Sequence, residues 1–499
     1  MTASPVAAAT VQFNPEARLY IDGRLRESAS GKTVDNINPA TEEVLGLCTD
    51  AGAEDMGEAI AAARRAFDTT DWSTNHDFRQ RCLMQLQDAL EEEKEDMRAE
   101  LVAEVGTPVA VTYIAQLEWP LADAIRWPAE YISQFAWERD LPDAALLGTP
   151  HHRKVIKEPM GVVGAITPWN FPFEIISNKM GQALATGNTL VLKPAIETPW
   201  SALRWGRIIA EKTDIPAGVV NIVPASDNNV AQMLATDPRV DMVSFTGSTA
   251  VGKLIQNLSG ETMKRNQLEL GGKSAYMVLD DADMNVALPG CMGALIHSGQ
   301  GCALATRMLV PRQFYDQAVE VATATFGAIA VGDPTNPANF CGPLVSAKQR
   351  ERVLNYIEIG KQQGGRVTVG GTVPDGLDRG YFVAPTVFAD VEPDHRIFQE
   401  EIFGPVLSIT PYDGGDDGLV EMANNSSYGL SGSVMGGSNE RAMAVAKRIR
   451  TGTVNVNGAL FYGADAPFGG YKMSGIGRQN GHEGFEQYLQ TKTIGYPIS

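Results

Sequence analysis

The stretch GVVGAITPWNFPFEIISNKMGQALATGNTLVLKP, residues 161–194, decides the fold. It contains two short apolar runs, GVVGAIT at 161–167 and NTLVLKP at 188–194, each the length of one buried strand. Residues 173–187 between them have the length of a helix and end at Gly187, a residue that favours a helix C-terminus. Two buried strands joined by a helix predict a parallel βαβ unit.

The same alternation continues downstream. Strands are predicted at 219–224 and 240–245, and helices at 198–213, 228–236 and 250–258. Strands that alternate with helices of this length predict an α/β fold with a doubly wound parallel sheet.

A second alternating block begins near residue 274 and continues past residue 470. Its predicted strands are 306–311, 381–388 and 404–412, and its predicted helices are 281–298 and 440–450. Two extended segments, 146–159 and 488–498, do not belong to the strand–helix alternation of either block. Strand-like segments outside a core often pair with another chain. A second sheet and a small β arm are therefore expected.

Length and net charge limit the number of domains and the kinds of partner that the chain is expected to have. The chain has 499 residues, which suggests about three domains, and its formal net charge is −19. Nucleic acid and anionic membrane surfaces both require a basic face, so neither is an expected partner. No run of 18 apolar residues is present, and a membrane-spanning helix is not expected.

The cysteines and the N-terminus indicate a reducing compartment. The five cysteines are scattered and form no CxxC pair, which argues against a disulfide framework and a zinc site. Residues 1–15 have neither a basic segment nor a long apolar run, so they do not predict a signal peptide. A cytoplasmic protein without a bound metal is expected.

The stretch FTGSTAVGKL at 245–254 comes close to a nucleotide-binding P-loop. That loop requires Ser or Thr after its lysine to ligate Mg²⁺, and here Leu254 follows Lys253. An ATP-using enzyme is therefore disfavoured. A strand-to-helix turn nevertheless offers free backbone N–H groups to an anion, although alone it is a weak signal.

Three side chains stand where catalytic chemistry would need them. Cys302, in SGQGCALATR, is flanked by small residues that leave a thiol approachable, although a small buried cysteine is the commoner case. Glu269, between two leucines, would have the raised pKa of a general base, or it is a capping or ion-paired glutamate. Asn170, just after a buried strand, offers an amide to an oxyanion, or it is a turn residue between two prolines.

Together, the motifs resemble one family along nearly the whole chain. TPWNFP, LVLKP, FTGSTAVG, LELGGKS, GQGC, EEIFGPV and PFGGYKMSGIGR occur in the order typical of the aldehyde dehydrogenase superfamily. The resemblance implies two doubly wound domains, Rossmann-like and catalytic, and an oligomerisation arm. The implied ranges are 8–139 and 160–270 for dinucleotide binding, 271–475 for catalysis, and 140–159 and 480–499 for the arm.

The resemblance also implies roles. The Cys302 thiolate would attack the aldehyde, Asn170 would hold the oxyanion, and Glu269 would activate the water that hydrolyses the thioester. The implied NAD(P) site comprises Ile166, Thr167, Pro168, Trp169, Lys193, Gly247, Ser248, Glu401 and Phe403. A surface acid is the alternative for Glu401.

One position departs from the family pattern. Many NAD-using members have Glu three residues after the lysine, where this chain has Ile196 and the acid follows as Glu197. NAD is the expected cofactor, with NADP as an alternative.

The implied aldehyde site favours a hydrophobic substrate. Its residues are Phe171, Ile175, Asn178, Tyr462 and Phe468, with Trp119 as a further candidate. The alternatives are a cysteine esterase that only binds nucleotide and a non-catalytic relative of the family. The extended segments imply a homodimer or homotetramer.

Overall fold

The structure is a computed structural model that describes residues 15–498. The prediction that residues 1–15 form no signal peptide lies outside the described residues, except at Pro15. Two predicted domain ranges also extend outside them, at residues 8–14 and at residue 499.

Within residues 15–498, the first sheet has eight strands, and its inner strands are parallel. Its order is β19 (Gly475–Ile476), β11 (Arg265–Glu269), β10 (Met242–Thr246), β7 (Val162–Ile166), β8 (Thr189–Lys193), β9 (Val220–Ile222), β1 (Leu19–Ile21) and β2 (Arg24–Arg26). The chain runs outward from β7 through β8 to β9, then returns to place β10 on the other side of β7. Ligands of open parallel sheets bind where the winding direction reverses, at the carboxyl ends of the strands.

Helices cover both faces of this sheet, as the strand–helix alternation predicts. The helices of this half are α1 (Ala53–Thr69), α2 (His76–Glu92), α3 (Lys94–Glu100), α4 (Val109–Thr112), α5 (Glu118–Asp123), α6 (Arg126–Tyr131), α7 (Pro172–Ala185), α8 (Pro199–Lys212), α9 (Asn228–Thr236) and α10 (Thr249–Ser259). α1, α9 and α10 pack on one face, and α7 and α8 pack on the other with α2 behind them.

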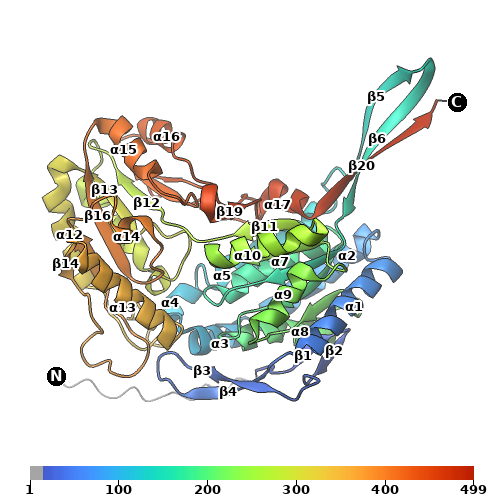
Figure 1. Ribbon diagram of the computed structural model, residues 1–499, viewed down its shortest axis with the longest axis horizontal. Helices are drawn as coiled ribbons and strands as arrows, with labels where there is room; N and C mark the ends of the chain where they lie inside the picture. Colours follow the sequence, from blue (N-terminus) through green and yellow to red (C-terminus); the bar gives the residue numbers. More distant parts are fainter. Residues whose placement is uncertain (1–14, 499) are drawn as a thin grey trace.

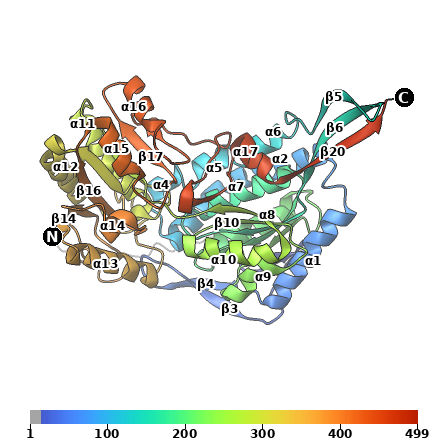
Figure 2. The same cartoon turned by 45° about the horizontal axis from the view of Figure 1, so that its top comes forward.

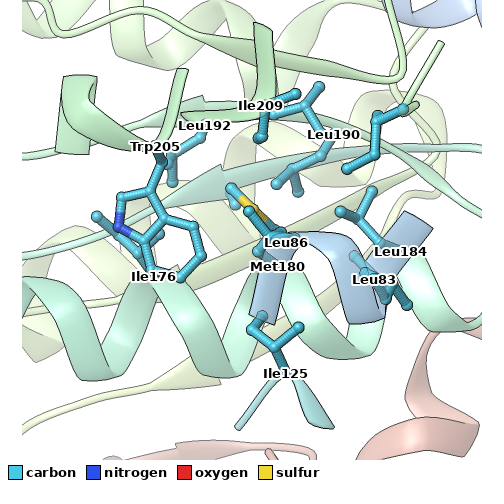
Figure 3. Close-up of a cluster of buried hydrophobic side chains, with 14 of the residues drawn as sticks. Leu83, Leu86, Ile125, Ile176, Met180, Leu184, Leu190, Leu192, Trp205 and Ile209 are labelled. Carbon is cyan, nitrogen blue, oxygen red and sulfur yellow. The ribbon is translucent and has the colours of Figure 1, made fainter. Parts of the chain in front are cut away.

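Alternating side chains of β8 fill the two cores that these helices close. Leu190 and Leu192 enter the core between the sheet and α7, α8 and α2, whereas Val191 enters the core beneath α1 and α9. Figure 3 shows Leu190 and Leu192 among side chains of α2, α7 and α8, including Met180 and Trp205. Because both faces are buried, the strand reads as a continuous apolar run.

Within the described residues, the second sheet has seven strands and is also wound in both directions. Its order is β14 (Arg366–Val369), β15 (Thr386–Ala389), β16 (Val406–Tyr412), β13 (Arg307–Pro311), β12 (Ala275–Val278), β17 (Gly432–Met435) and β18 (Asn455–Val456). The remaining helices are α11 (Met284–Ala287), α12 (Tyr315–Gly327), α13 (Ala347–Gln362), α14 (Arg396–Gln399), α15 (Gly415–Asn424), α16 (Asn439–Ala446) and α17 (Gly481–Gln487). The predicted fold class is confirmed.

The arm is a separate three-stranded antiparallel sheet. Its strands are β5 (Glu138–Leu146), β6 (Thr149–Pro159) and β20 (Leu489–Pro497), with β6 in the middle. Figures 1 and 2 show it projecting from the lobe of the first sheet, at the end of the molecule away from the second sheet. A smaller hairpin pairs β3 (Thr33–Ile37) with β4 (Val44–Thr49). No helix in the described part has the length and apolarity needed to cross a membrane.

Candidate active site

Three neighbouring strands of the first sheet bring candidate residues to one edge. β10 lies between β7 and β11 in parallel register, with Ile166 opposite Phe245 and Thr246 opposite Glu269. Because the three strands end at the same level, the segments that follow them converge. Glu269 ends β11, and Asn170 lies in the segment between β7 and α7.

Cys302 reaches this edge from the second sheet's part of the chain. The sequence predicts one helix over 281–298, but the structure has the short α11, then a 3₁₀ segment from Pro289 to Gly299. His297, Ser298 and Gly299 have φ values of 50°, 53° and 74°, which a right-handed helix cannot include. This correction matters because the left-handed turn directs the chain into the loop that carries Cys302.

Two cavities meet at the thiol. One has a volume of about 420 Å³ and the other of about 190 Å³. Asn170, Thr246, Glu269 and Cys302 line both cavities. The structure therefore brings the three predicted catalytic side chains together where two reactants could approach one sulfur atom from different sides.

Glu269 is a buried carboxyl without a hydrogen-bond partner. It is 3% exposed, and neither carboxyl oxygen is hydrogen-bonded to any residue in the described range. Burial raises its pKa to about 8, although the charges of Lys179 and Arg478 and the nearby side chain of Gln267 lower it. A carboxyl in this state can take up or release a proton near neutral pH.

Two glycines let the chain after Glu269 pass closely between its neighbours. A Cβ on Gly271 would lie 2.5 Å from the Glu401 carboxyl, and one on Gly272 would lie 2.4 Å from the Cys302 carbonyl oxygen. The Gly272 N–H donates to Glu401 Oε1 at 2.8 Å. Burial raises the pKa of Glu401 to about 7, and this hydrogen bond opposes the rise.

Asn170 is held on both sides. The side-chain N–H of Asn170 donates to the Gln300 backbone carbonyl at 2.8 Å, and the Asn170 backbone carbonyl accepts from Gln116 Nε2 at 2.7 Å. Gln300 stands two residues before Cys302, so the first bond ties the amide to the thiol's loop. The amide group has a second N–H to offer to a reacting oxygen.

The surroundings of the thiol disfavour its charged form. Burial raises the pKa of Cys302. The carboxyls of Glu401, Glu174 and Glu269 raise it further. The thiol form is therefore favoured here, and a hydrogen-bond donor or a positive charge that enters the site would favour the thiolate.

The larger cavity contains most of the residues predicted to bind the cofactor. Its predicted lining residues are Pro168, Trp169, Gly247, Ser248, Glu401 and Phe403. Phe403 has φ of 64°, unusual for a bulky residue, and its ring lies 5.5 Å from that of Trp169 in an edge-to-face arrangement.

Three predicted cofactor residues do not line either cavity: Ile166, Thr167 and Lys193. Ile166 and Lys193 end neighbouring strands and face each other in register, and the Thr167 N–H donates to the Lys193 carbonyl at 3.2 Å. Sequence analysis missed other lining residues of the larger cavity: Thr246, Leu270, Gly271, Ser346, Lys348, Gln349 and Arg352. The last four come from α13 and the residue before it, which only the tertiary fold brings to the first sheet.

The smaller cavity is lined by all five residues predicted for it: Phe171, Ile175, Asn178, Tyr462 and Phe468. Trp119 does not line it, but its ring lies 5.5 Å from that of Tyr462. Phe461 and Glu174 were missed. The sequence could have predicted Glu174, because it lies three residues after Phe171 and four before Asn178, on the same face of a helix.

Comparison with known proteins shows similarity to one enzyme family along nearly the whole chain. The profile of the Aldehyde dehydrogenase family matches residues 25–494. The chain is 42% identical over 478 residues to 3-succinoylsemialdehyde-pyridine dehydrogenase of a Pseudomonas species, covering 95% of this chain and 97% of the relative.

Solved structures agree in fold. The NAD⁺ complex of an aldehyde dehydrogenase from Bacillus cereus superposes with a TM-score of 0.92 at 38% identity, covering 98% of both chains. A mutant of aldehyde dehydrogenase C from Pseudomonas syringae, complexed with NAD⁺ and octanal, superposes with a TM-score of 0.91 at 36% identity, covering 97% of this chain and 98% of the other.

The raised pKa of Glu269 predicts a pH-dependent loss of stability. The unfolded carboxyl has a pKa of about 4.3. The folded protein therefore holds this proton more tightly, and its free energy of unfolding falls as pH rises from about 4 through 8. Glu269→Gln removes that loss, so the variant is expected to melt above the wild type at pH 8, by on the order of 2 °C, with a smaller difference at pH 5. Calorimetry at pH 5 and pH 8 measures the difference in melting temperature between the variant and the wild type. Glu351→Gln, which alters an exposed carboxyl of α13, is the control, and equal melting of Glu269→Gln and wild type at pH 8 would contradict the assignment.

Proposed function

The chain belongs to the aldehyde dehydrogenase family and is an NAD(P)-dependent aldehyde dehydrogenase, and from that premise we propose that Cys302, Glu269 and Asn170 convert an aldehyde into a carboxylic acid. One observation carries the proposal: these three side chains line both cavities, so they face the aldehyde and the cofactor together.

The first step is addition. Cys302 Sγ attacks the aldehyde carbon, and its proton passes to a base or to solvent. The carbonyl oxygen becomes an oxyanion, which the free N–H of the Asn170 amide and the Cys302 backbone N–H stabilise as the thiohemiacetal forms. The bond from Asn170 to the Gln300 carbonyl keeps this amide oriented toward the thiol's loop.

The larger cavity fits a dinucleotide. The turn after β10 places Gly247 and Ser248 at the start of α10, where the N–H groups of the first helical turn suit a pyrophosphate. The Gly247 N–H itself donates to the Glu269 carbonyl at 3.0 Å. The carboxylate of Glu401 suits ribose hydroxyls, and Phe403 would pack on the nicotinamide ring. When bound, NAD⁺ supplies the hydride acceptor, which leaves a thioester on Cys302.

The last step is hydrolysis. Glu269 takes a proton from a water molecule, which attacks the thioester carbonyl and releases the acid and the thiol. With a pKa of about 8, the ionised form of Glu269 is populated near and above neutral pH and accepts that proton. A thiol acceptor such as coenzyme A would need no such base, which favours the acid-forming reaction.

We also propose that NAD is preferred over NADP. Glu197, and not Ile196, lines the larger cavity, and its charge acts on Lys193 at the end of β8. A carboxylate here would repel the 2′-phosphate of NADP.

The substrate is proposed to have an apolar body. The smaller cavity contains Phe171, Ile175, Tyr462 and Phe468. The Pseudomonas syringae enzyme was crystallised with octanal, and the Pseudomonas relative is named for a pyridine-bearing semialdehyde. Both have an apolar or aromatic portion, as this cavity requires.

We also propose an assembly, two domain ranges and a location for the chain. The arm of β5, β6 and β20 extends away from the rest of the chain and suits pairing with a second copy, as a homodimer or homotetramer. The two large sheets support the predicted dinucleotide-binding and catalytic ranges. The five free cysteines, including Cys302, support a reducing cytoplasm.

Replacing the thiol tests the proposal. A panel of aldehydes with NAD or NADP should give reduced nicotinamide with the wild type, and Cys302→Ala should lower kcat/KM by about a thousandfold or more because the nucleophile is lost. Cys291→Ala is the matched control, since Cys291 is buried away from both cavities. Ester hydrolysis without aldehyde oxidation would favour the cysteine esterase, and full activity in Cys302→Ala would contradict the mechanism.

Cofactor choice has its own test. Glu197→Gln is expected to lower the ratio of kcat/KM for NAD to that for NADP by about two- to fivefold, because an exposed carboxylate exerts a modest, screened repulsion. The ratio is measured at low ionic strength beside Glu421→Gln, an exposed control. An unchanged ratio in Glu197→Gln would exclude a role for this carboxylate.

A further inference from the structure

Glu174 is built into the wall of the smaller cavity. Phe171, Glu174, Ile175 and Asn178 follow the i, i+3, i+4, i+7 spacing of one helix face, and all four line this cavity. The opposite face of α7, with Met180, packs into the core (Figure 3). A rotation of α7 that took the carboxyl out of the cavity would expose that core face, so the carboxyl stays with the substrate site.

The carboxyl has no cationic neighbour in the cavity. In the described part of the chain, the lining of the smaller cavity includes the carboxyls of Glu174 and Glu269 and no Lys, Arg or His. Burial raises the pKa of Glu174 to about 7, and a hydrogen bond from the Tyr462 hydroxyl opposes the rise. A carboxylate held in an apolar place without a counter-charge is costly, and a positively charged ligand would relieve that cost.

The rest of the wall is rich in aromatic rings. Phe171, Phe461, Tyr462 and Phe468 all line the cavity. The faces of aromatic rings attract ammonium groups, most strongly when the group carries alkyl substituents and is shielded from water. A cavity lined by aromatic rings and by the Glu174 carboxyl suits an alkylated ammonium group, whereas a purely hydrocarbon substrate would need no carboxylate at the Glu174 position.

We propose that the smaller cavity takes an aldehyde whose far end carries an ammonium group, and that Glu174 is the residue that selects it. This inference rests on the proposed dehydrogenase function and adds a charge to its apolar substrate. Aldehydes that carry a carboxylate are disfavoured, because Glu174 and Glu269 would repel it. The net charge of −19 also attracts cations toward the protein.

The same charge would help the thiol. Glu174 is one of three carboxyls that hold the pKa of Cys302 up. An ammonium group beside Glu174 cancels part of that negative potential, so the substrate itself would favour the thiolate. Selection by Glu174 is therefore expected in kcat/KM, which includes both binding and the attack of the thiol.

A pair of isosteric aldehydes tests the proposal. 4-(Trimethylammonio)butanal and 5,5-dimethylhexanal have the same shape and differ by one positive charge. With the wild type, saturating NAD and pH 8, kcat/KM should be higher for the cationic aldehyde. Glu174→Gln should lower the ratio of cationic to neutral kcat/KM by about 30-fold or more, since the ammonium group loses its partner inside the cavity. Glu130→Gln, which alters an exposed carboxyl of α6, should keep the wild-type ratio.

The outcomes separate this inference from the proposed function. If the wild type does not prefer the cationic aldehyde, the inference is overturned without any variant, while NAD-dependent oxidation of the neutral aldehyde leaves the dehydrogenase reaction standing. If Glu174→Gln lowers both kcat/KM values equally, Glu174 has a structural role only and the inference fails. If no aldehyde is oxidised by the wild type, both the function and the inference fail.

Discussion

The register of three parallel strands is the constraint on which the site depends. β7, β10 and β11 end at one level, so Asn170, the turn after Thr246, and Glu269 meet at one edge of the first sheet. The second sheet contributes Cys302 through a loop that left-handed residues 297–299 turn toward that edge. A shift of one residue in either strand pair would reverse which side chains face the cavities. The placement of the proposed catalytic residues therefore depends on the register of the sheet.

Charge is the second organising feature. Glu269 is buried and Glu401 and Glu174 are partly exposed near one thiol, and the loss of solvent raises the pKa of each. Such a cluster destabilises the folded protein, which is the usual cost of a site prepared for reaction. The cluster makes chemical sense if each carboxyl has a different partner: water for Glu269, ribose hydroxyls for Glu401, and the far end of the substrate for Glu174. In this account the site becomes electrostatically balanced only when both reactants are present.

The sequence predicted the fold class well because the βαβ rhythm from 161 onward is local, and β8 is apolar on both faces. The three proposed catalytic residues were also predicted from short motifs, and the structure places them together. The α13 side of the cofactor cavity, with Lys348 and Arg352, was missed because only packing between the two halves brings it there. The helix predicted over 281–298 was wrong because the α-helix ends at Ala287 and a 3₁₀ segment begins at Pro289, a residue without the N–H that an α-helix needs. The left-handed residues 297–299 end that segment. Glu174 was missed although its helical spacing was readable.

The central claim is that Cys302 holds the acyl group and that Glu269 releases it. Intact-mass measurement of Glu269→Gln, quenched after mixing with an aldehyde and NAD, tests this most directly. The account predicts a stable adduct equal to the aldehyde minus two hydrogens, on the peptide that contains Cys302, with about one reduced nicotinamide formed per site before turnover slows. Reduction of NAD without any adduct, or an adduct on another residue, would contradict it.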